Sequence, residues 1–428
     1  MSQHFDCLIV GTGHAGAQTA ISLRQQNFQG SIGLLGEEFD PPYERPSLSK
    51  DYLAGEKPFA RILIRPIDFW KTREISLLLG RRVTEVDAGN HSLTCADGSA
   101  FTYGSLVWAA GGAARKLACP GGQLDGVHRV RARPDVDAMQ ERLSETARII
   151  VIGGGYIGLE AAAVLRKQGH QVTVLEAMDR VLARVAGEPL SRFYEDEHRA
   201  MGVDVRLGVA VRSLEGRDGR VEAVCLSSGE HVAADMVIVG IGIEPSVGPL
   251  LAAGASGGNG VDVDGFCRTA LPDVFAIGDC ARHANVFAGN VRIRLESVQN
   301  ASDQAATVAK VLTGHPEHYE TVPWFWSNQY DLRLQTVGIS SGHDQAVVRG
   351  DPKTRKFSVI YLKQGVVQAL DCVNAVKDYV EGKGLVTGRV SASPEMLADT
   401  AITLKSLQHA AIAAPPAPYN QEPSLCPN

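Results

Sequence analysis

The hydrophobic pattern at the N-terminus predicts a buried strand, a glycine turn and a helix in direct succession. Residues 5–10 form an apolar run broken only by Asp6, which is typical of a buried parallel strand. Residues 11–16 read GTGHAG, and residues 17–23 have a helical pattern. A glycine turn between strand and helix lets bare backbone N–H groups approach a pyrophosphate. This pattern predicts a dinucleotide site, with a purely structural turn as the alternative.

An acidic residue stands where such a site needs one. The next apolar run, residues 31–36, predicts the second strand, and Glu37 follows it directly. A carboxylate about 20 residues after the glycine turn accepts hydrogen bonds from a ribose hydroxyl. Its presence at this spacing strengthens the prediction of a dinucleotide site.

The whole pattern occurs a second time. Residues 148–152 predict a strand, Gly153, Gly155 and Gly158 belong to a second glycine turn, and residues 159–165 predict a helix. The strand predicted at residues 171–175 ends at Glu176, again at the expected spacing. One dinucleotide needs only one such motif, so two motifs predict two dinucleotides.

Each glycine turn is followed by short alternating runs, which predict a small antiparallel meander, and by a buried strand that ends in glycines. The meander runs are residues 82–86 with 92–95 in the first half and 203–207 with 221–226 in the second; the glycine-ended strands are 105–112 and 236–242. The repeated order indicates a duplicated dinucleotide-binding fold.

Residues 274–281, VFAIGDCA, predict a buried strand that ends at Gly278 and Asp279. The carboxylate of Asp279 suits the hydroxyls of a ribityl chain, or alternatively it caps the helix that follows. A helical pattern covers residues 296–312. Beyond about residue 321 the chain predicts a third, α+β domain.

The third domain begins with the aromatic segment PWFWSNQY and continues with a hairpin over residues 357–362 and 366–370. Trp324 and Trp326 in that segment are more often core residues than cofactor contacts. The alanine- and proline-rich end of the chain predicts a disordered tail.

Residues 40–50, DPPYERPSLSK, contain three prolines and therefore predict a stiff loop rather than a helix interior or central strand. The loop carries Arg45 and Lys50. Two interpretations stay open from the residues alone: a solvated connector, or a rigid clamp that places two cations beside a cofactor.

The overall composition is that of a globular protein. The 428 residues are 44% hydrophobic and 21% charged, so two or three domains are expected. The formal net charge of −6 gives no support to a role in binding nucleic acid or an anionic membrane. No apolar run approaches the ~20 residues of a membrane span. The first residues enter a strand without a leader pattern, which predicts a cytoplasmic protein.

The eight cysteines are widely spaced. No two are close enough for a metal knuckle or a local redox disulfide, so no metal site is predicted. A distant pair that meets in space stays possible.

The two glycine motifs, the PPYERPSLSK loop, GGGYIGLE, FAIGDCA, RLESVQNA and PWFWSNQYD together resemble the FAD-dependent NADH:ferredoxin reductases, of the putidaredoxin reductase and aromatic-ring dioxygenase reductase type. The resemblance covers residues 5–408. It implies an α/β, glutathione-reductase-like fold with two Rossmann-like domains and a C-terminal α+β domain. The implied boundaries are 1–115 and 249–320 for the FAD domain, 116–248 for the NADH domain, 321–408 for the C-terminal domain and 409–428 for a disordered tail.

The resemblance also implies the binding residues. For FAD they are Gly11, Gly13, His14, Ala15, Gly16, Glu37, Arg45, Lys50, Val83, Ala110, Gly111, Arg131, Gly278, Asp279, Glu296, Ser297, Val298 and Trp326. For NADH they are Gly153, Gly155, Tyr156, Ile157, Gly158, Glu160, Glu176, Arg184 and Gly242. The chain departs from the family pattern at Ala110, where the family has ATG and this chain has Ala109-Ala110-Gly111, and at Ser47 and Asn328. Asn328 removes a charge from near the flavin.

The implied function is hydride transfer from NADH to FAD, followed by single-electron transfer to a two-iron two-sulfur ferredoxin. That ferredoxin would serve a heme-thiolate monooxygenase or an aromatic-ring dioxygenase. The resemblance implies Lys50 and Glu160 as a catalytic pair and a monomer or weak dimer. Glu176 predicts a preference for NADH over NADPH, with Arg180 and Arg184 as possible phosphate contacts. Docking of an acidic ferredoxin is expected to use a basic patch, with Arg292, Arg294 and Arg333 as candidates.

Two alternatives are weighed against this function. An oxidase or disulfide reductase would need a cysteine near the flavin, and none lies between Cys7 and Cys95. A redox-sensing interaction protein similar to apoptosis-inducing factor would need no ferredoxin, but no targeting segment and no basic patch of the kind that binds nucleic acid supports it.

Overall fold

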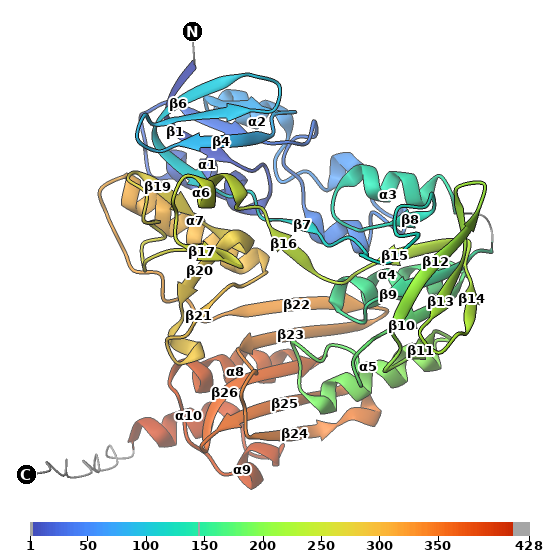
Figure 1. Cartoon of the computed structure of the whole chain (residues 1–428). Coiled ribbons are helices and arrows are strands. Elements are labelled where there is room, and N and C mark those ends of the chain that lie inside the picture. Colours follow the sequence, from blue (N-terminus) through green and yellow to red (C-terminus); the bar gives the residue numbers. More distant parts are fainter. Residues whose placement is uncertain (1–2, 144–145, 414–428) are drawn as a thin grey trace, which may run out of the picture.

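The computed structural model describes residues 3–143 and 146–413 (Figure 1). Two Rossmann-like domains lie beside each other, and the C-terminal α+β domain packs below them in the view of Figure 1. Among the described residues, no helix combines the length and the hydrophobicity that crossing a membrane requires.

The first sheet is built around the N-terminal strand. Its strands in spatial order are β3 (Ile75–Leu78), β2 (Ile32–Leu35), β1 (Gln3–Val10), β6 (Ala100–Trp108), β5 (Ser92–Cys95) and β4 (Val83–Asp87), and β19 (Val274–Ala276) pairs with β6. The strands β3, β2, β1, β6 and β19 pair in parallel, whereas β4 and β5 form the predicted antiparallel meander. The helices α1 (His14–Gln25) and α7 (Val298–Leu312) pack against each other on this sheet.

The second sheet repeats this plan. Its spatial order is β11 (Asp204–Arg206), β10 (Gln171–Leu175), β9 (Arg148–Ile152), β15 (Met236–Val239) and β8 (Val127–His128), all parallel. Its helices are α3 (Arg133–Gln140), α4 (Tyr156–Lys167) and α5 (Glu188–Ala200). A separate antiparallel meander consists of β12 (Val211–Arg217), β13 (Arg220–Leu226) and β14 (His231–Ala233).

One prediction about this meander is wrong. Residues 203–207 were expected to be its first strand, but β11 pairs in parallel with β10 in the main sheet. A short alternating run suits either setting, because the period of 2 does not distinguish a sheet edge from a hairpin. The meander partner of β13 is β12, which follows β11 directly.

Two antiparallel strands, β7 (Gly112–Ala114) and β16 (Ile243–Pro245), carry the chain out of the first Rossmann domain and back into it (Figure 1). The returning chain forms α6 (Gly248–Ala252) and a small sheet of β17 (Gly257–Gly258), β18 (Gly260–Asp262), β20 (Ala281–Ala284) and β21 (Arg292–Ile293) before α7. The first domain is therefore built from two separate stretches of chain.

The C-terminal domain is a five-stranded antiparallel sheet covered by helices. Its spatial order is β22 (Trp324–Gln329), β23 (Leu332–Gly338), β26 (Val366–Val373), β25 (Lys356–Lys363) and β24 (Gln345–Asp351), with α8 (Val376–Thr387), α9 (Pro394–Ala398) and α10 (Leu404–Ala413). The predicted hairpin is confirmed as β25 and β26. The predicted tail is wrong for residues 409–413, which continue α10; its remainder, 414–428, lies outside the described residues.

The proline-rich segment contains more regular structure than a plain loop. A 3₁₀ helix, η1 (Arg45–Ser49), forms in it, with Pro46 in the first turn, where the missing N–H has no helical partner to lose. Further short helices are η2 (Phe59–Arg61), α2 (Ile67–Thr72), η3 (Gly278–Cys280), η4 (Val286–Ala288) and η5 (Pro352–Thr354).

One hydrophobic core joins the second Rossmann domain to the C-terminal sheet. Phe193 and Tyr194 of α5 share a cluster with Phe357 and Tyr361 of β25, and the rings of Phe193 and Phe357 meet edge to face at 4.8 Å. A shared core of this kind fixes the relative position of the two domains.

Candidate functional site

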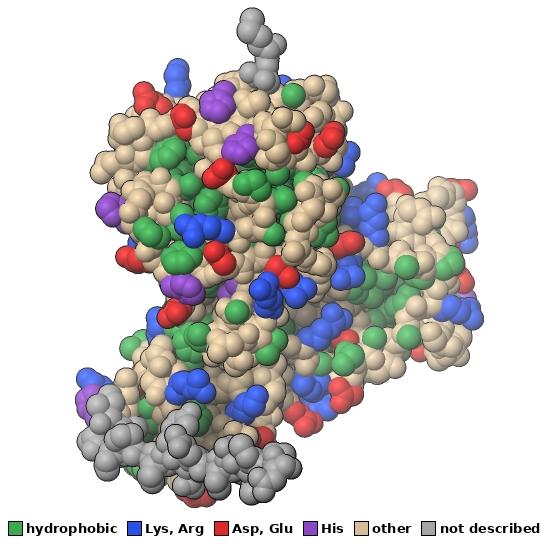
Figure 2. All heavy atoms as spheres, turned by 60° about the vertical axis from the view of Figure 1, so that its left-hand side comes forward, with side chains coloured by type: hydrophobic (Ala, Val, Ile, Leu, Met, Phe, Trp, Pro, Cys, Tyr) green, Lys and Arg blue, Asp and Glu red, His purple; other side chains and the backbone are tan. Residues whose placement is uncertain are grey.

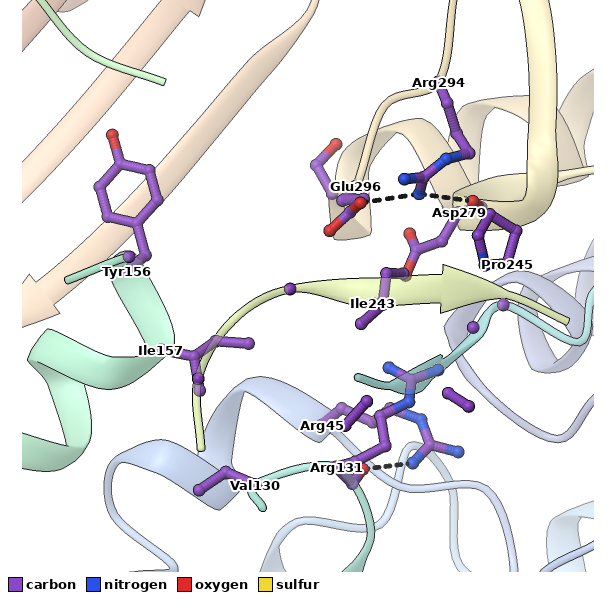
Figure 3. A pocket seen from close by; sticks show the side chains of 18 of the residues that line it. Arg45, Val130, Arg131, Tyr156, Ile157, Ile243, Pro245, Asp279, Arg294 and Glu296 are labelled. Atoms are coloured by element: carbon purple, nitrogen blue, oxygen red, sulfur yellow. Dashed lines mark hydrogen bonds and ion pairs between the residues drawn. The ribbon is translucent and has the colours of Figure 1, made fainter. Parts of the chain in front are cut away.

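A cavity of about 2020 Å³ lies where the three domains meet, and both glycine turns line it. Pockets for a single drug-sized ligand are typically ~300–1,000 Å³. A cavity of this volume, with two equivalent glycine turns in its wall, has room for two dinucleotides. Figure 3 shows the part of its wall around β16.

In the first turn the glycines are required by close packing. Gly11 has φ +115°, and a Cβ there would overlap the carbonyl oxygen of Ala109. A Cβ at Gly16 would overlap the carbonyl oxygen of Gly11, so the helix could not lie so close to the strand. Gly13 is the N-cap of α1 and offers no capping side chain. The first N–H groups of α1 are therefore left for an anion.

The second turn repeats these features. Gly153 has φ +107°, and a Cβ there would overlap the carbonyl oxygen of Gly240. A Cβ at Gly158 would overlap the carbonyl oxygen of Gly153. Gly155 caps α4 and has open space at its Cβ position. The two turns are thus equivalent anion-binding sites at two helix N-termini.

The two acidic residues that follow the turns differ in their surroundings. Glu176 is fixed, because its Oε2 accepts a hydrogen bond from the Gly154 N–H at 2.6 Å and its Oε1 accepts one from the Met178 N–H at 2.8 Å. The side chain of Glu37 is 73% exposed and lies 3.9 Å from the guanidinium of Arg82. Both line the cavity.

Two arginines concentrate positive charge beside the first turn (Figure 3). Arg45 forms an ion pair with Glu38 and donates a hydrogen bond to the carbonyl oxygen of Arg131 at 2.7 Å. The guanidinium of Arg131 has no ion pair within the described part of the chain. Burial and then the charge of Arg45 lower the pKa of Arg131. Two partly buried guanidinium groups with one carboxylate partner fit an anionic pyrophosphate.

Burial, Arg45 and Arg131 also lower the pKa of His14 to about 4. At neutral pH this imidazole therefore adds no further charge to the cationic wall. The ion pair of Arg45 with Glu38 is a contact that the sequence pattern did not indicate.

Asp279 lies on the other side of β16 in Figure 3. Burial raises the pKa of its carboxyl to about 6. Arg294 donates one hydrogen bond to the Asp279 carbonyl oxygen at 2.9 Å and is paired with Glu296 at 2.7 Å. The alternative of Asp279 as a helix cap is wrong, because Ile277 is the N-cap of η3 and Ser297 caps α7 by accepting the Asn300 N–H at 3.0 Å.

The predicted pair of Lys50 and Glu160 forms, with Nζ and Oε2 2.6 Å apart. The same Oε2 accepts a hydrogen bond from the Ser49 hydroxyl at 2.7 Å, and Oε1 accepts one from the Ser327 hydroxyl at 2.6 Å. Glu160 is 3% exposed. One buried carboxylate therefore connects η1, α4 and β22, one element from each domain.

Most of the predicted cofactor residues line the cavity. They are Gly11, Gly13, His14, Ala15, Glu37, Arg45, Val83, Ala110, Gly111, Arg131, Asp279, Glu296, Ser297, Val298, Gly153, Gly155, Tyr156, Ile157, Glu176, Arg184 and Gly242. Those absent from the wall are Gly16, Lys50, Gly278, Trp326, Gly158 and Glu160. The glycines among these serve close packing, whereas Lys50 and Glu160 lie directly behind Ser49, which does line the cavity.

Part of the aromatic segment that begins the C-terminal domain contributes side chains to the cavity wall. Trp324 and Phe325 line the cavity, and Phe325 lies 4.7 Å from the ring of Tyr156. Trp326 does not line it; its ring is tilted against that of Trp324 at 5.6 Å. Both tryptophans are half-buried. Trp324 packs against the core of the C-terminal domain as well as lining the cavity, so for this residue the core and cavity interpretations hold together.

Asp371 is a cavity residue that sequence reasoning missed. It lies on β26 and is 3% exposed, and burial raises the pKa of its carboxyl to about 7. The Tyr361 hydroxyl donates a hydrogen bond to it at 2.6 Å and accepts one from the Gly187 N–H at 3.0 Å. In the sequence, an acidic residue within the alternating pattern of a strand did not indicate that Asp371 would line the cavity.

The cysteines bear on the kind of redox chemistry. None of those in the described part of the chain lines the cavity, and each described cysteine is free. The wall thus offers no thiol to a reaction in the cavity.

Comparisons with known proteins place these features in a family. The family model described as pyridine nucleotide-disulphide oxidoreductase matches residues 5–305, and the reductase C-terminal model matches residues 324–408. A ferredoxin reductase subunit of 5,5'-dehydrodivanillate O-demethylase from a Sphingobium species is 60% identical over 94% of this chain and 98% of its own. A ferredoxin–NAD(P)(+) reductase from a Sphingomonas species is 57% identical over 92% and 95%. In the crystal structure of a covalent putidaredoxin reductase–putidaredoxin complex, the matched chain has a TM-score of 0.92, with 37% identity over 96% of this chain and 99% of that one.

Proposed function

This chain belongs to the pyridine nucleotide-disulphide oxidoreductase family, and we propose that it is the NADH-dependent ferredoxin reductase of an oxygenase system. Its cofactors are FAD and a nicotinamide dinucleotide. The main observation that supports one binding site for each dinucleotide is the cavity lined by two equivalent glycine turns. The first turn, with Arg45, Arg131 and Asp279, holds FAD, and the second, with Glu176, holds NADH.

FAD supplies the chemistry when bound, because it accepts a hydride and releases electrons one at a time. The residues of this chain bind and orient the two dinucleotides and exclude water from the space between them. The absence of a cysteine among the lining residues supports an acceptor outside the chain rather than an internal disulfide. The acceptor is a small two-iron two-sulfur ferredoxin, and the protein works in the cytoplasm as a monomer or weak dimer.

The ferredoxin docks through exposed basic side chains. Figure 2 shows Lys and Arg side chains around the hollow between the upper and lower parts of the molecule. Among the predicted docking residues, Arg333 is exposed, whereas Arg292 is half exposed and paired with Asp262 at 3.3 Å. Arg294 is a poor candidate, because its side chain is 11% exposed and paired with Glu296. Arg333 is therefore the preferred docking residue.

The test is NADH-driven reduction of a two-iron two-sulfur ferredoxin by the yellow, FAD-loaded protein. We expect kcat/KM for ferredoxin to fall with rising ionic strength and to fall about tenfold in Arg333→Glu, because exposed charge pairs steer association. NADH oxidation with ferricyanide, a small acceptor that needs no docking surface, is expected to stay unchanged.

The control is Arg217→Glu, which reverses another exposed arginine, paired with Glu222, on β12 in a different domain. Equal losses in the two variants would contradict the docking role of Arg333. A protein that takes up FAD and oxidises NADH but reduces no ferredoxin at any salt concentration would contradict the function.

The shared carboxylate of Glu160 suggests how the C-terminal domain takes part in the reaction. Glu160 holds the ammonium of Lys50, and Ser327 of β22 holds the second oxygen of Glu160. Ser327 is completely buried, so water cannot replace its hydroxyl. Ser327 is in this view a positioning residue for the pair of Lys50 and Glu160.

For Ser327→Ala we expect the rate of NADH oxidation at saturating NADH to fall about tenfold or more, because a hydrogen bond to a charged group contributes ~1.5–3 kcal/mol and each ~1.36 kcal/mol is a factor of ten in rate. Stopped-flow absorbance measures this rate. The control is Ser358→Ala, which removes another fully buried hydroxyl of the same domain, bonded to Asp378 at 2.9 Å. Both variants lose stability, so only a loss of rate confined to Ser327→Ala supports positioning.

A further inference from the structure

A second constellation of ligating side chains lies far from the glycine turns, on the meander of β12, β13 and β14. Glu215, Cys225 and His231 bring one ligand atom each within 4.8 Å of one another. We propose that Cys225 and His231, with Glu215 fixing the imidazole, bind a thiophilic divalent cation of the Zn²⁺ class.

The register of the sheet creates this cluster. Cys225 and His231 are directly opposite each other in the pairing of β13 with β14. Side chains directly opposite in an antiparallel pair lie on the same face with Cβ atoms about 4.5–5.5 Å apart. On the other side, Cys225 is opposite Ser213, and Glu215 lies two residues further along β12, on the same face.

This face is the outer one. The residues next to the cluster, Leu214, Val224 and Val232, point the other way into a hydrophobic core. The side chains of His231 and Glu215 are 52% and 47% exposed. Cys225 between them is buried. An ion held by its sulfur and by His231 therefore completes its coordination with water from the exposed side of His231.

The distances match a bridging ion. The sulfur of Cys225 and the Nε2 of His231 are 3.8 Å apart. Bonds of about 2.3 Å from zinc to sulfur and about 2.0–2.1 Å from zinc to nitrogen, at the tetrahedral angle of about 109°, give a separation of about 3.6 Å, so only a small shift of either side chain is needed. The Nδ1 of His231 lies 2.9 Å from a carboxylate oxygen of Glu215, which is the usual outer partner of a zinc-bound histidine.

The arrangement also defines the proton balance. With Nδ1–H donating to Glu215, Nε2 is left as an acceptor, and the thiol proton of Cys225 has two acceptors within reach: Nε2 at 3.8 Å and the Leu226 carbonyl oxygen at 3.7 Å. Zn²⁺ takes the place of that single proton: the S–H bond breaks, the Zn–S and Zn–N bonds form, and one proton leaves to solvent. Arg212 donates a hydrogen bond to the sulfur at 2.9 Å, and this exposed side chain must turn away as the cation enters.

The experiment is isothermal titration of the FAD-loaded protein, freed of metal by a chelator, with Zn²⁺ in two buffers of different ionisation enthalpy. We expect one site per chain and one proton released per ion. Binding is expected to weaken more than tenfold in Cys225→Ser and His231→Ala, and ~10–100-fold in Glu215→Gln. In Arg212→Gln it is expected to tighten several-fold, because a competing cation is removed.

Two controls match the chemistry of the site. Cys119→Ser removes a different, partly buried thiol, and His318→Ala removes a histidine that lies 3.4 Å from the carboxylate of Glu320. Both are expected to bind Zn²⁺ like the unchanged protein. Absence of binding, or equal binding in Cys225→Ser or His231→Ala, would overturn the proposal. Circular dichroism of each variant checks that the fold is kept.

Discussion

Replacing Lys50 by alanine is expected to slow the oxidation of NADH by the FAD-loaded protein about 100-fold. The hydride brings negative charge into a cavity whose wall includes Ser49, and the ammonium of Lys50 lies directly behind that wall, 16% exposed and paired with Glu160. Removing one fixed electrostatic partner of a developing charge costs about 10²–10³ in rate. Stopped-flow reduction by NADH measures the effect, and a potentiometric titration of the flavin is expected to show a lower potential.

The control is Lys57→Ala. Lys57 is a surface lysine in the same segment, about half exposed and paired with Asp51. Exposed pairs of this kind contribute little, so its rate and potential are expected to stay unchanged. If Lys50→Ala reduced as fast as Lys57→Ala, with the same flavin potential, Lys50 would have no part in the reaction.

A preference of about 100-fold for NADH over NADPH is the second large effect that we expect. The carboxylate of Glu176 is held at the end of β10 by two backbone N–H groups, so it cannot turn away from the ribose site. A 2′-phosphate would bring like charge against it, at a cost of several kcal/mol. Each 1.4 kcal/mol corresponds to a factor of ten.

The neighbouring arginines decide how strict this preference is. Arg180 is occupied, because it donates hydrogen bonds to the Ala186 carbonyl at 2.8 Å and the Ser191 hydroxyl at 2.7 Å. Arg184 lines the cavity and is the remaining candidate for a phosphate contact.

The measurement is kcat/KM for both nucleotides. Glu176→Gln keeps the size of the side chain and removes its charge, and the ratio is expected to fall at least tenfold. Glu37→Gln, the same change at the equivalent position after β2, is expected to keep the ratio. A ratio near one in the unchanged protein, or an equal ratio in both variants, would show that Glu176 does not select the nucleotide.

Sequence reasoning reached the parts of the fold that depend on neighbours along the chain. The glycine turns, the strands before them and the acids after them are local patterns, and both helices begin at the positions that the turns define. Gly11 and Gly153 carry a strong signal, because only glycine fits a left-handed backbone packed against another strand.

Contacts between distant residues gave no such signal. The hydrogen bond of Ser327 to Glu160 joins residues 167 positions apart, and that of Arg45 to Arg131 joins residues 86 positions apart. The pairing of β11 with β10 depends on which edge of the second sheet was open to another strand. The cluster of Cys225 with His231 depends on the register between β13 and β14. Register is fixed by the packing of a whole face rather than by any one residue.

The insertion of β19 beside β6 has a consequence for the synthesis of the chain. Val274–Ala276 leaves the ribosome about 170 residues after Trp108, which at ~5–20 residues per second is a delay of roughly 10–30 s. Throughout this time Leu106, Val107 and Trp108, which β19 covers in the finished sheet, have an open edge. The strands of the second sheet, from β8 to β15, are all made within the same interval. The nascent chain therefore completes its second nucleotide domain while the first is still an open sheet, and that edge is where a stalled or truncated chain is most exposed to aggregation.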